Sequence, residues 1–264
     1  MSETPDLLTE RRGHVLVVTL NRPEARNAFS PDMLVRAYDA WKELDEDPDL
    51  RVGVVKGAGG NFCSGMDLKA LAKGVSKETG RRMAEDPDLH WKALLRHFRP
   101  SKPIVAAVEG YCVAGGTEIL QAMELRVAGE SAQFAIAEVR RGLFPLGGST
   151  VRLQRQIPYT MAADLLLTGR MISASEAKAV GLIGHVVPDG KALDKAIELA
   201  EAIAANGPVA VAAVLRSMRE TKDLSEADGL VRELELGWPI FETEDSKEGP
   251  KAFAEKRDPV FKGR

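Results

Sequence analysis

The stretch IVAAVEGYCVAGGTEILQAM, from Ile104 to Met123, joins a strand-like run, a glycine-rich loop and a helical pattern without a break. Its first segment, Ile104–Glu109, is apolar and rich in β-branched residues, which favours a buried strand. The glycines then permit a turn, and the apolar residues of the predicted helix Ala114–Met123 return at helical spacing. This order of elements is typical of an α/β protein.

The same alternation extends in both directions along the chain. Further strands are predicted at His14–Leu20, Arg51–Lys56, Leu125–Ala128, Gln133–Ala137 and His185–Val187. Helices are predicted at Pro31–Glu46 behind a Ser30 cap, at Tyr159–Thr168 and at Ser175–Val180, which ends near Gly181. Strands interleaved with helices indicate the α/β fold class.

The C-terminal third differs from the rest because no strand pattern follows Lys191. Gly207-Pro208 is typical of a helix start, and Leu224–Leu236 is amphipathic. We therefore expect a core over residues 1–190 that holds the site, and a helical region over residues 191–264.

Composition narrows the class of partner. The chain has 264 residues, of which 44% are hydrophobic, and 36 basic against 39 acidic residues leave a formal charge of -3. Neither sign forms a long block, so we expect no nucleic acid and no membrane surface as partner. No apolar run approaches the roughly 20 residues of a membrane span, and Met1–Leu8 is acidic, so we expect a cytoplasmic protein with a small-molecule partner.

The cysteines and histidines do not predict a metal or nucleophilic site. Cys63 and Cys112 stand in apolar stretches without a neighbouring ligand at metal spacing, so both are interpreted as small core residues. The four histidines are scattered, and no serine lies in a nucleophile-elbow pattern. Metal binding and nucleophilic catalysis are therefore disfavoured.

Two glycine-rich loops follow predicted strands, over Gly57–Lys69 and over Glu109–Glu118. Glycine lets a ligand approach the backbone, and a helix start leaves N–H groups unpaired, so two such loops can direct two donors at one oxygen. The alternative is that the glycines only form turns. A dinucleotide site is disfavoured because Phe62 stands where a third glycine is needed.

Two carboxylates stand beside these loops in apolar surroundings. Glu118 belongs to the first turn of the predicted helix, and Glu138 follows the apolar run Gln133–Ala137. Most glutamates are solvated surface groups, and that alternative remains open for both. If they are buried together, such a pair suits general acid and base chemistry.

Together these residues resemble the crotonase, or enoyl-CoA hydratase/isomerase, family. The resemblance spans nearly the whole chain and rests on the order and spacing of short motifs. These motifs are Asn21–Ala28, Phe62–Lys69, Ala114–Glu118, Ala132–Phe134 with Glu138, Leu167–Arg170 with Ser173, Ala177 and Gly181-Leu182, and Ala252–Arg257. The resemblance implies a ClpP-like spiral of ββα units with a C-terminal helical trimerisation region.

The resemblance also implies an activity. Family members place the thioester carbonyl between the amides that match Met66 and Gly115, and hydratases keep two glutamates that match Glu118 and Glu138. We therefore expect reversible hydration of a 2-trans-enoyl-CoA to a 3-hydroxyacyl-CoA. The helix start favours an anionic Glu118 as the base, with Glu138 protonating Cα; the reverse division of roles is the alternative, because coupled groups titrate as a pair. The alternatives are a 3,2-enoyl-CoA isomerase and a non-catalytic acyl-CoA-binding protein.

Coenzyme A is expected as part of the substrate, with no separate cofactor and no metal. Family likeness places the following residues near it, the last of them from a neighbouring subunit: Ala25, Arg26, Ser64, Asp67, Leu68, Lys69, Phe253 and Lys256. Many members carry lysine where this chain has Glu24, and glycine where it has Leu146, which bears on the phosphate contacts and the acyl pocket. A homotrimer or a dimer of trimers is implied.

Overall fold

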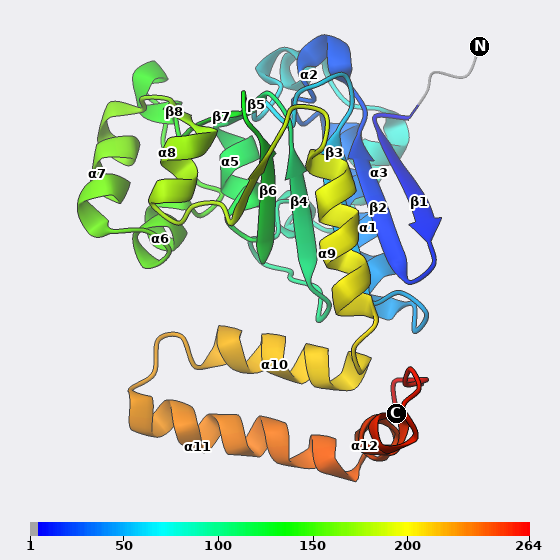
Figure 1. Cartoon of the computed structure of the whole chain (residues 1–264). Helices are drawn as coiled ribbons and strands as arrows, with labels where there is room; N and C mark the ends of the chain where they lie inside the picture. The colour runs from blue at the N-terminus through cyan, green and yellow to red at the C-terminus, as the bar shows by residue number, and fades with distance from the viewer. Residues whose placement is uncertain (1–4) are drawn as a thin grey trace.

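Two β-sheets organise the chain in the computed structural model, which describes residues 5–264 apart from the side chains of Leu71 and Lys73 (Figure 1). The expectation for the acidic N-terminus falls partly on Met1–Thr4, which lie outside this range. The larger, six-stranded sheet has the order β1-β2-β3-β4-β6-β9 and is parallel except at the β1–β2 hairpin. Its strands are β1 (Leu7–Arg12), β2 (Val15–Leu20), β3 (Val52–Gly57), β4 (Ile104–Val108), β6 (Leu125–Gly129) and β9 (His185–Val187).

The second sheet has three short strands and lies beside the carboxyl ends of β4 and β6. It consists of β5 (Tyr111–Val113), β7 (Gln133–Ala135) and β8 (Ile172–Ser173). The chain passes from β4 to β5 and again from β6 to β7, so successive units add one strand to each sheet. This repetition is the spiral that the resemblance implies.

Helices surround the sheets and continue beyond them. In the core they are α1 (Pro31–Glu46), α2 (Leu68–Lys73), α3 (Lys77–Glu85), α4 (Leu89–Ala93), α5 (Gly115–Leu120), α6 (Ser149–Arg152), α7 (Tyr159–Thr168), α8 (Ala174–Ala179) and α9 (Ala192–Ala204). They are followed by α10 (Pro208–Glu220), α11 (Glu226–Gly237) and α12 (Glu244–Glu255). Short 3-10 turns are η1 (Pro23–Ala25), η2 (Glu138–Arg141), η3 (Leu153–Arg155) and η4 (Trp238–Glu242).

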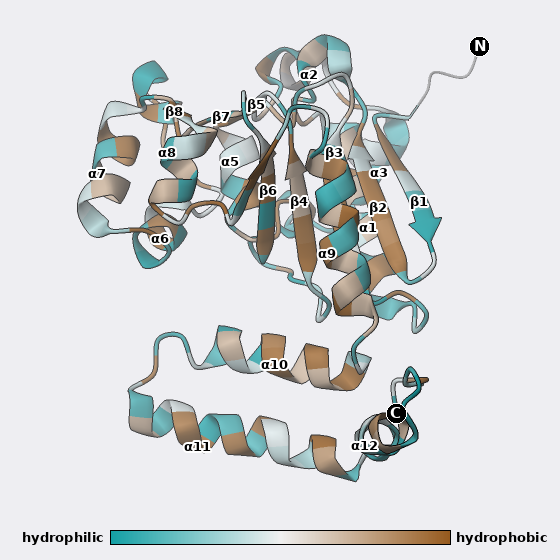
Figure 2. Cartoon of the chain, viewed as in Figure 1, coloured by the Kyte–Doolittle hydropathy of each residue, from teal (hydrophilic) through white to brown (hydrophobic). Residues whose placement is uncertain are grey.

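The central strands β2, β3, β4 and β6 of the large sheet are mostly buried, which explains their continuous apolar runs (Figure 2). Along β2, Leu16 and Val18 join the cluster that includes Trp41 of α1, whereas Val15 and Val17 join the cluster under α9. The α9 side of the interface is lined by small residues, Ala192, Ala196, Ala200 and Ala204, all buried. The small side chains allow α9 to approach the sheet closely.

The strongest sequence patterns predicted their elements to the residue. The helices Pro31–Glu46 and Tyr159–Thr168 are confirmed, and Ser30 caps the first by accepting a bond from the Met33 N–H at 3.0 Å. Two predicted elements are shorter in the structure. The helix expected at Ala114–Met123 spans only Gly115–Leu120 (α5), and the strand expected at Gln133–Ala137 ends at Ala135, before η2 begins.

Three strands escaped the pattern analysis. β1 reads LLTERR and is exposed except at Leu7, because it is an edge strand that pairs with the core on one side only. β5 and β8 hold three and two residues, too few for a period-2 signal. The helix predicted at Ser175–Val180 starts and ends one residue earlier, as α8.

The C-terminal helices α10, α11 and α12 form a layer below the sheets in Figure 1. α9 lies within the predicted helical region 191–264, yet it packs on the large sheet. We therefore propose that the boundary between core and helical region lies at residues 205–207. Among residues 5–264 no single helix is long and apolar enough to cross a membrane; only the α9–α10 pair, bent by 107°, passes on length and composition.

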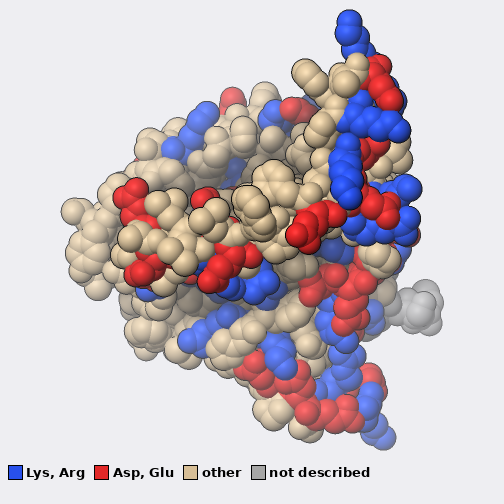
Figure 3. Space-filling model, turned by 90° about the horizontal axis from the view of Figure 1, so that it is seen from below, with Lys and Arg blue, Asp and Glu red and all other residues tan. Residues whose placement is uncertain are grey.

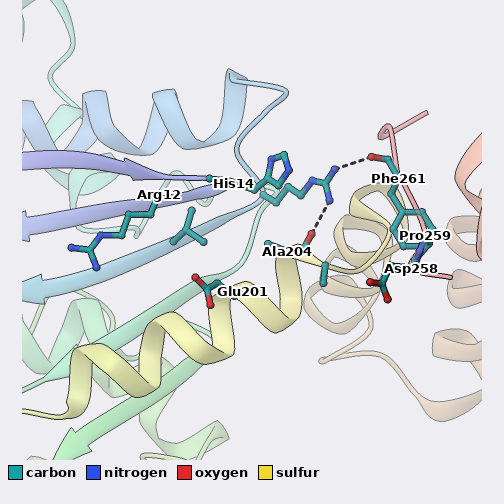
Figure 4. A pocket seen from close by; sticks show the side chains of 11 residues that line it. Arg12, His14, Glu201, Ala204, Asp258, Pro259 and Phe261 are labelled. Atoms are coloured by element: carbon teal, nitrogen blue, oxygen red, sulfur yellow. Dashed lines mark hydrogen bonds between the residues drawn. The ribbon is translucent and has the colours of Figure 1, made fainter.

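One arginine ties the helical layer to the core. Arg51, just before β3, donates to the Ala204 carbonyl at 2.7 Å and to the Phe261 carbonyl at 2.9 Å (Figure 4). It thereby joins the end of α9 and the C-terminal tail across an open hollow of about 700 Å³ that Arg12 and Glu201 also line.

We predict that Arg51→Met loosens the C-terminal layer, because two carbonyl groups lose a charged donor. The expected loss of unfolding free energy is about 1.5 to 3 kcal/mol, with faster native-state proteolysis near residues 205–207. Arg12→Met is the matched control, since Arg12 lines the same hollow but its side chain, among the described residues, bonds only Glu10. Equal proteolysis of the two variants would contradict the role of Arg51.

Candidate active site

The two glycine-rich loops lie side by side and are joined through their backbones. Cys63 and Cys112 form an isolated parallel bridge, in which the Val113 N–H donates to the Cys63 carbonyl at 2.9 Å and the Cys63 N–H to the Tyr111 carbonyl at 3.0 Å. Both cysteines are fully buried, as expected. Because of this bridge, the segments that follow, at Met66 and Gly115, run next to each other.

The amides of Met66 and Gly115 are neighbours. A Cβ atom built on Gly115 would lie 3.7 Å from the Met66 nitrogen, and one built on Gly65 would lie 3.1 Å from the Gly115 nitrogen. On either side of Met66, Gly65 and Asp67 are bonded to Phe29. Within residues 5–264 no acceptor takes either N–H, so both donors are free to bind one ligand atom.

The backbone next to these amides is strained. Ala114 adopts φ 50° and ψ -126°, a conformation that L-residues rarely adopt, and it orients the peptide whose N–H belongs to Gly115. Position 116 must be glycine, because a Cβ on Gly116 would lie 2.4 Å from the Cys63 carbonyl oxygen. The contact between the loops therefore dictates the direction of the donor.

Glu118 lies one turn after Gly115 and is only 6% exposed. The Ser149 N–H donates to its Oε1 at 3.3 Å, and a Cβ on Gly147 would come within 2.7 Å of its Oε2. Burial raises the pKa of Glu118, and bonds from Ser149 and Gly147 oppose that rise. Desolvation of the carboxyl group therefore opposes the anionic form that the helix start is expected to favour.

Glu138 begins η2 and is half-buried, with an Oε2 atom that has no hydrogen-bond partner among the described residues. Burial raises the pKa of Glu138 to about 7, and the negative charge of Glu118 adds to that rise. The two carboxyl groups therefore interact electrostatically. One of them tends to keep its proton at neutral pH.

Three of the residues expected near coenzyme A gather beside the first loop. The Ser64 hydroxyl donates to the Ala25 carbonyl at 3.2 Å, and the Ser64 N–H donates to the Arg26 carbonyl at 3.0 Å. The Arg26 guanidinium is exposed and lies over the Tyr111 ring, 5.1 Å from its centre. The structure thus brings Ala25, Arg26 and Ser64 together.

Asp67, Leu68 and Lys69 continue from the same loop into α2. The Asp67 carboxylate caps this helix through the N–H groups of Lys69 and Ala70 and pairs with Arg22 at 2.8 Å, which together lower its pKa. That carboxylate is therefore already occupied by its own chain. The side chains of Leu68 and Lys69 are exposed.

Phe253 and Lys256 do not join this group within one chain. Both are exposed and lie at the end of α12, at the opposite end of the molecule from α2 in Figure 1. A single chain therefore cannot bring them to the loops at Met66 and Gly115.

Two residues that shape the site, Ser149 and Asn27, were not predicted to do so from the sequence. Ser149 donates its N–H to Glu118. In the sequence, the position of Ser149 beside Gly147-Gly148 is the one feature that distinguishes it from other serines. Asn27 is fully buried and its amide donates to the carbonyls of Ala58 and Asn61, at 2.8 and 2.7 Å, which fixes the start of the first loop. Its neighbour Arg26 and Asn27 itself both have positive φ, which a pattern search does not reveal.

The loop Phe144–Ser149 has an apolar cavity behind it. This cavity has a volume of about 250 Å³ and is lined by Val139, Phe144, Pro145, Tyr159, Leu166 and Leu167, among others. Leu146, which replaces a glycine common in related sequences, points outward and is 53% exposed. Leu146 therefore does not line this cavity.

Known proteins match the chain over nearly its full length. A family model described as enoyl-CoA hydratase/isomerase matches residues 10–264. The enoyl-CoA hydratase EchA19 of Mycobacterium tuberculosis is 56% identical over 98% of this chain and 97% of its own. The (E)-benzylidenesuccinyl-CoA hydratase of Thauera aromatica is 39% identical over 96% of this chain and 98% of its own.

Solved structures agree with this match. The enoyl-CoA hydratase EchA1 from Mycobacterium marinum superposes with a TM-score of 0.89 at 43% identity, covering 99% of this chain and all of that one, 100%. The fold is thus the crotonase fold expected from the sequence motifs. By its sequence and its fold, the chain belongs to the enoyl-CoA hydratase/isomerase family.

Proposed function

We propose that this protein is an enoyl-CoA hydratase that adds water reversibly to a 2-trans-enoyl-CoA. The observation that carries the proposal is the pair Glu118 and Glu138, two carboxyl groups whose pKa values are raised by burial and which interact electrostatically. They lie beside two neighbouring unpaired amides, those of Met66 and Gly115. Hydration of a conjugated thioester needs a base, an acid and donors for the enolate oxygen at the same time.

The amides of Met66 and Gly115 bind the thioester oxygen. As water attacks Cβ, negative charge moves from the double bond to this oxygen, and two fixed N–H groups stabilise it without rearrangement. The Ala114 conformation, held by the contact between the loops, keeps these donors aimed before substrate arrives. Loss of one such donor typically slows a reaction about 100- to 1,000-fold.

Glu118 and Glu138 divide the proton transfers. Glu118 takes one proton from water while the water oxygen bonds Cβ, and Glu138 gives its proton to Cα. The product is the 3-hydroxyacyl-CoA, and the pair still holds one proton, now on Glu118. Because both groups act from the same compartment, oxygen and proton enter the same face of the double bond. The higher pKa of Glu138 suits its role as the acid.

The coenzyme A part of the substrate lies along the first loop in this proposal. Ala25, Arg26, Ser64, Leu68 and Lys69 contact it, and exposed Arg26 and Lys69 supply positive charge for its phosphates. Asp67 acts by capping α2, which carries Leu68 and Lys69.

We also propose a homotrimer, or two trimers paired, in which Phe253 and Lys256 reach the substrate of a neighbouring subunit. The C-terminal layer exposes large apolar side chains, each 55–86% accessible in the single chain: Val214, Met218, Leu230, Val231, Leu234, Trp238, Phe241 and Phe253. Seen from below, the charged groups are interspersed, and neither sign dominates this face (Figure 3). Apolar side chains in such number favour packing against another copy. A cytoplasmic enzyme of lipid degradation is the setting that fits this proposal.

We predict that Glu118→Gln slows hydration of crotonyl-CoA about 100- to 10,000-fold, because water loses its base. The assay follows loss of the conjugated thioester absorbance, with 3-enoyl-CoA as a second substrate. Glu130→Gln is the matched control, since Glu130 is exposed and away from the loops. Survival of 3-to-2 isomerisation with no wild-type hydration would favour an isomerase, and binding without turnover would favour an acyl-CoA-binding protein.

The pKa values predict a bell-shaped pH dependence of kcat/KM for hydration. The active form of the free enzyme holds one proton on the pair, with Glu118 ionised and Glu138 protonated. Since the pKa of Glu138 is raised to about 7, kcat/KM should decline as pH rises through that value. A rate that stays constant up to pH 9, about two units higher, would exclude Glu138 as the acid.

We predict that the wild-type protein has a solution mass of three or six times the chain mass of 28.6 kDa by light scattering. Leu234→Lys should lower this mass and raise KM for the thioester, because separated chains lose the neighbour's Phe253 and Lys256. Glu233→Lys adds the same group on another face of α11 and serves as control. A monomeric wild type with full activity would reject the assembly.

A further inference from the structure

A buried chain of polar groups extends from Glu118 away from the substrate side. Glu118, Ser149 and Gln121 are 6%, 0% and 2% exposed, so their polar atoms depend on partners within the protein, and Gln121 Oε1 has none among the described residues. The Ser149 N–H donates to Glu118 Oε1 at 3.3 Å, and Gln121 Nε2 donates to Ser149 Oγ at 2.8 Å. The Ser149 side chain also lowers the pKa of Glu118, against the rise that burial causes.

The direction of the hydrogen bonds from Gln121 through Ser149 to Glu118 follows from the number of protons that each group carries. A serine hydroxyl carries one proton, and the bond from Gln121 occupies an Oγ lone pair without using it. The proton of Ser149 is therefore free for Glu118, and a bond to a charged acceptor is about twice as strong as a neutral one. A reversed Gln121 amide would take this proton instead, so the charge on Glu118 favours the orientation present.

Gln121 is itself fixed in place. Its backbone carbonyl accepts bonds from Gln156 Nε2 at 2.8 Å and from the Arg126 guanidinium at 3.1 Å. Arg126 also donates to the carbonyls of Met123 and Leu182, which ties the end of α5 to the loop before β9. The main chain of Gln121 is thus held by the fold, and its side chain bonds Ser149 through Nε2.

Two other charged groups act on Glu118. Glu138 interacts with it electrostatically, because the charge of Glu118 raises the pKa of Glu138. Arg152 of α6 favours its ionisation from a distance, but its own bonds go to the carbonyls of Gly147 and Leu95, at 3.4 and 2.6 Å. Among the described residues Ser149 is the one whose side chain and N–H both act on the Glu118 carboxylate.

We propose that Ser149 is a positioning residue that holds Glu118 ionised and oriented as the base, and that Gln121 directs the Ser149 hydroxyl toward it. This inference rests on the proposed hydratase function. Ser149 acts through Glu118 and is itself fully buried. Its two donors offset the burial that would otherwise keep Glu118 protonated, so the base is available at lower pH.

The test compares pH profiles of hydration for Ser149→Ala, Ser149→Thr and Gln121→Met. Ser149→Ala should move the acid limb of kcat/KM upward by about one to two pH units, because the carboxylate loses a donor to its charged form. At a fixed pH on that limb, kcat/KM falls about 10-fold for each pH unit that the limb moves, while the alkaline limb and KM change little. Ser149→Thr should restore the wild-type profile, and Gln121→Met should give a smaller upward displacement.

Ser173→Ala is the matched control for simple destabilisation. Ser173 caps α8 through the Glu176 N–H, so its loss should lower Tm without moving either limb. An acid limb in Ser149→Ala that stays at its wild-type position would overturn the proposal. If Ser149→Ala does not fold, the same conclusion follows from an unmoved limb in Gln121→Met.

A titration of the Glu118 carboxyl carbon by NMR separates this proposal from the proposed function. The wild-type resonance is assigned by its loss in Glu118→Gln and followed in Ser149→Ala and Gln121→Met. A midpoint at higher pH in these variants supports the positioning role even if no enoyl thioester is hydrated. A protein that hydrates substrate normally while the midpoint is unchanged retains the proposed function and loses this inference.

Discussion

Two carboxyl groups that share a poorly solvated compartment cannot both ionise easily, and the rest of this site is arranged around that constraint. Removing a carboxylate from water favours its neutral form, and a second negative charge nearby favours it further. Both effects act on Glu138, and burial acts on Glu118. At neutral pH the pair therefore tends to hold one proton, the state that an acid and a base working together require.

The fold creates this compartment by holding two loops together. The bridge between Cys63 and Cys112 places Met66 beside Gly115, and the strained Ala114 turns the Gly115 amide outward. Helix α5 starts at this point, so Glu118 lies one turn away from the amide donor. Strain and buried carboxyl groups both destabilise a folded chain, and the two packed faces of the large sheet supply the stability that offsets them.

The related hydratases are named for different thioesters, which is consistent with a shared catalytic site and variable acyl contacts. A hydratase of aromatic (E)-benzylidenesuccinyl-CoA is 39% identical to this chain over nearly the whole length of both. In our proposal the groups that handle the carbonyl and the protons lie on α5, η2 and the joined loops. The acyl chain is then free to vary against other surfaces, such as the loop Phe144–Ser149. That division separates the chemistry from the choice of substrate.

The sequence by itself determined the α/β class and the family, because periodicity, capping and motif order are local in the chain. Pro31–Glu46 with its Ser30 cap is the clearest case. Only the tertiary structure decided that Glu118 and Glu138 interact electrostatically, that burial raises the pKa of Glu118, and that Ser149 bonds it. It also placed α9 on the sheet. These results depend on burial and on contacts between distant segments, which no local pattern encodes.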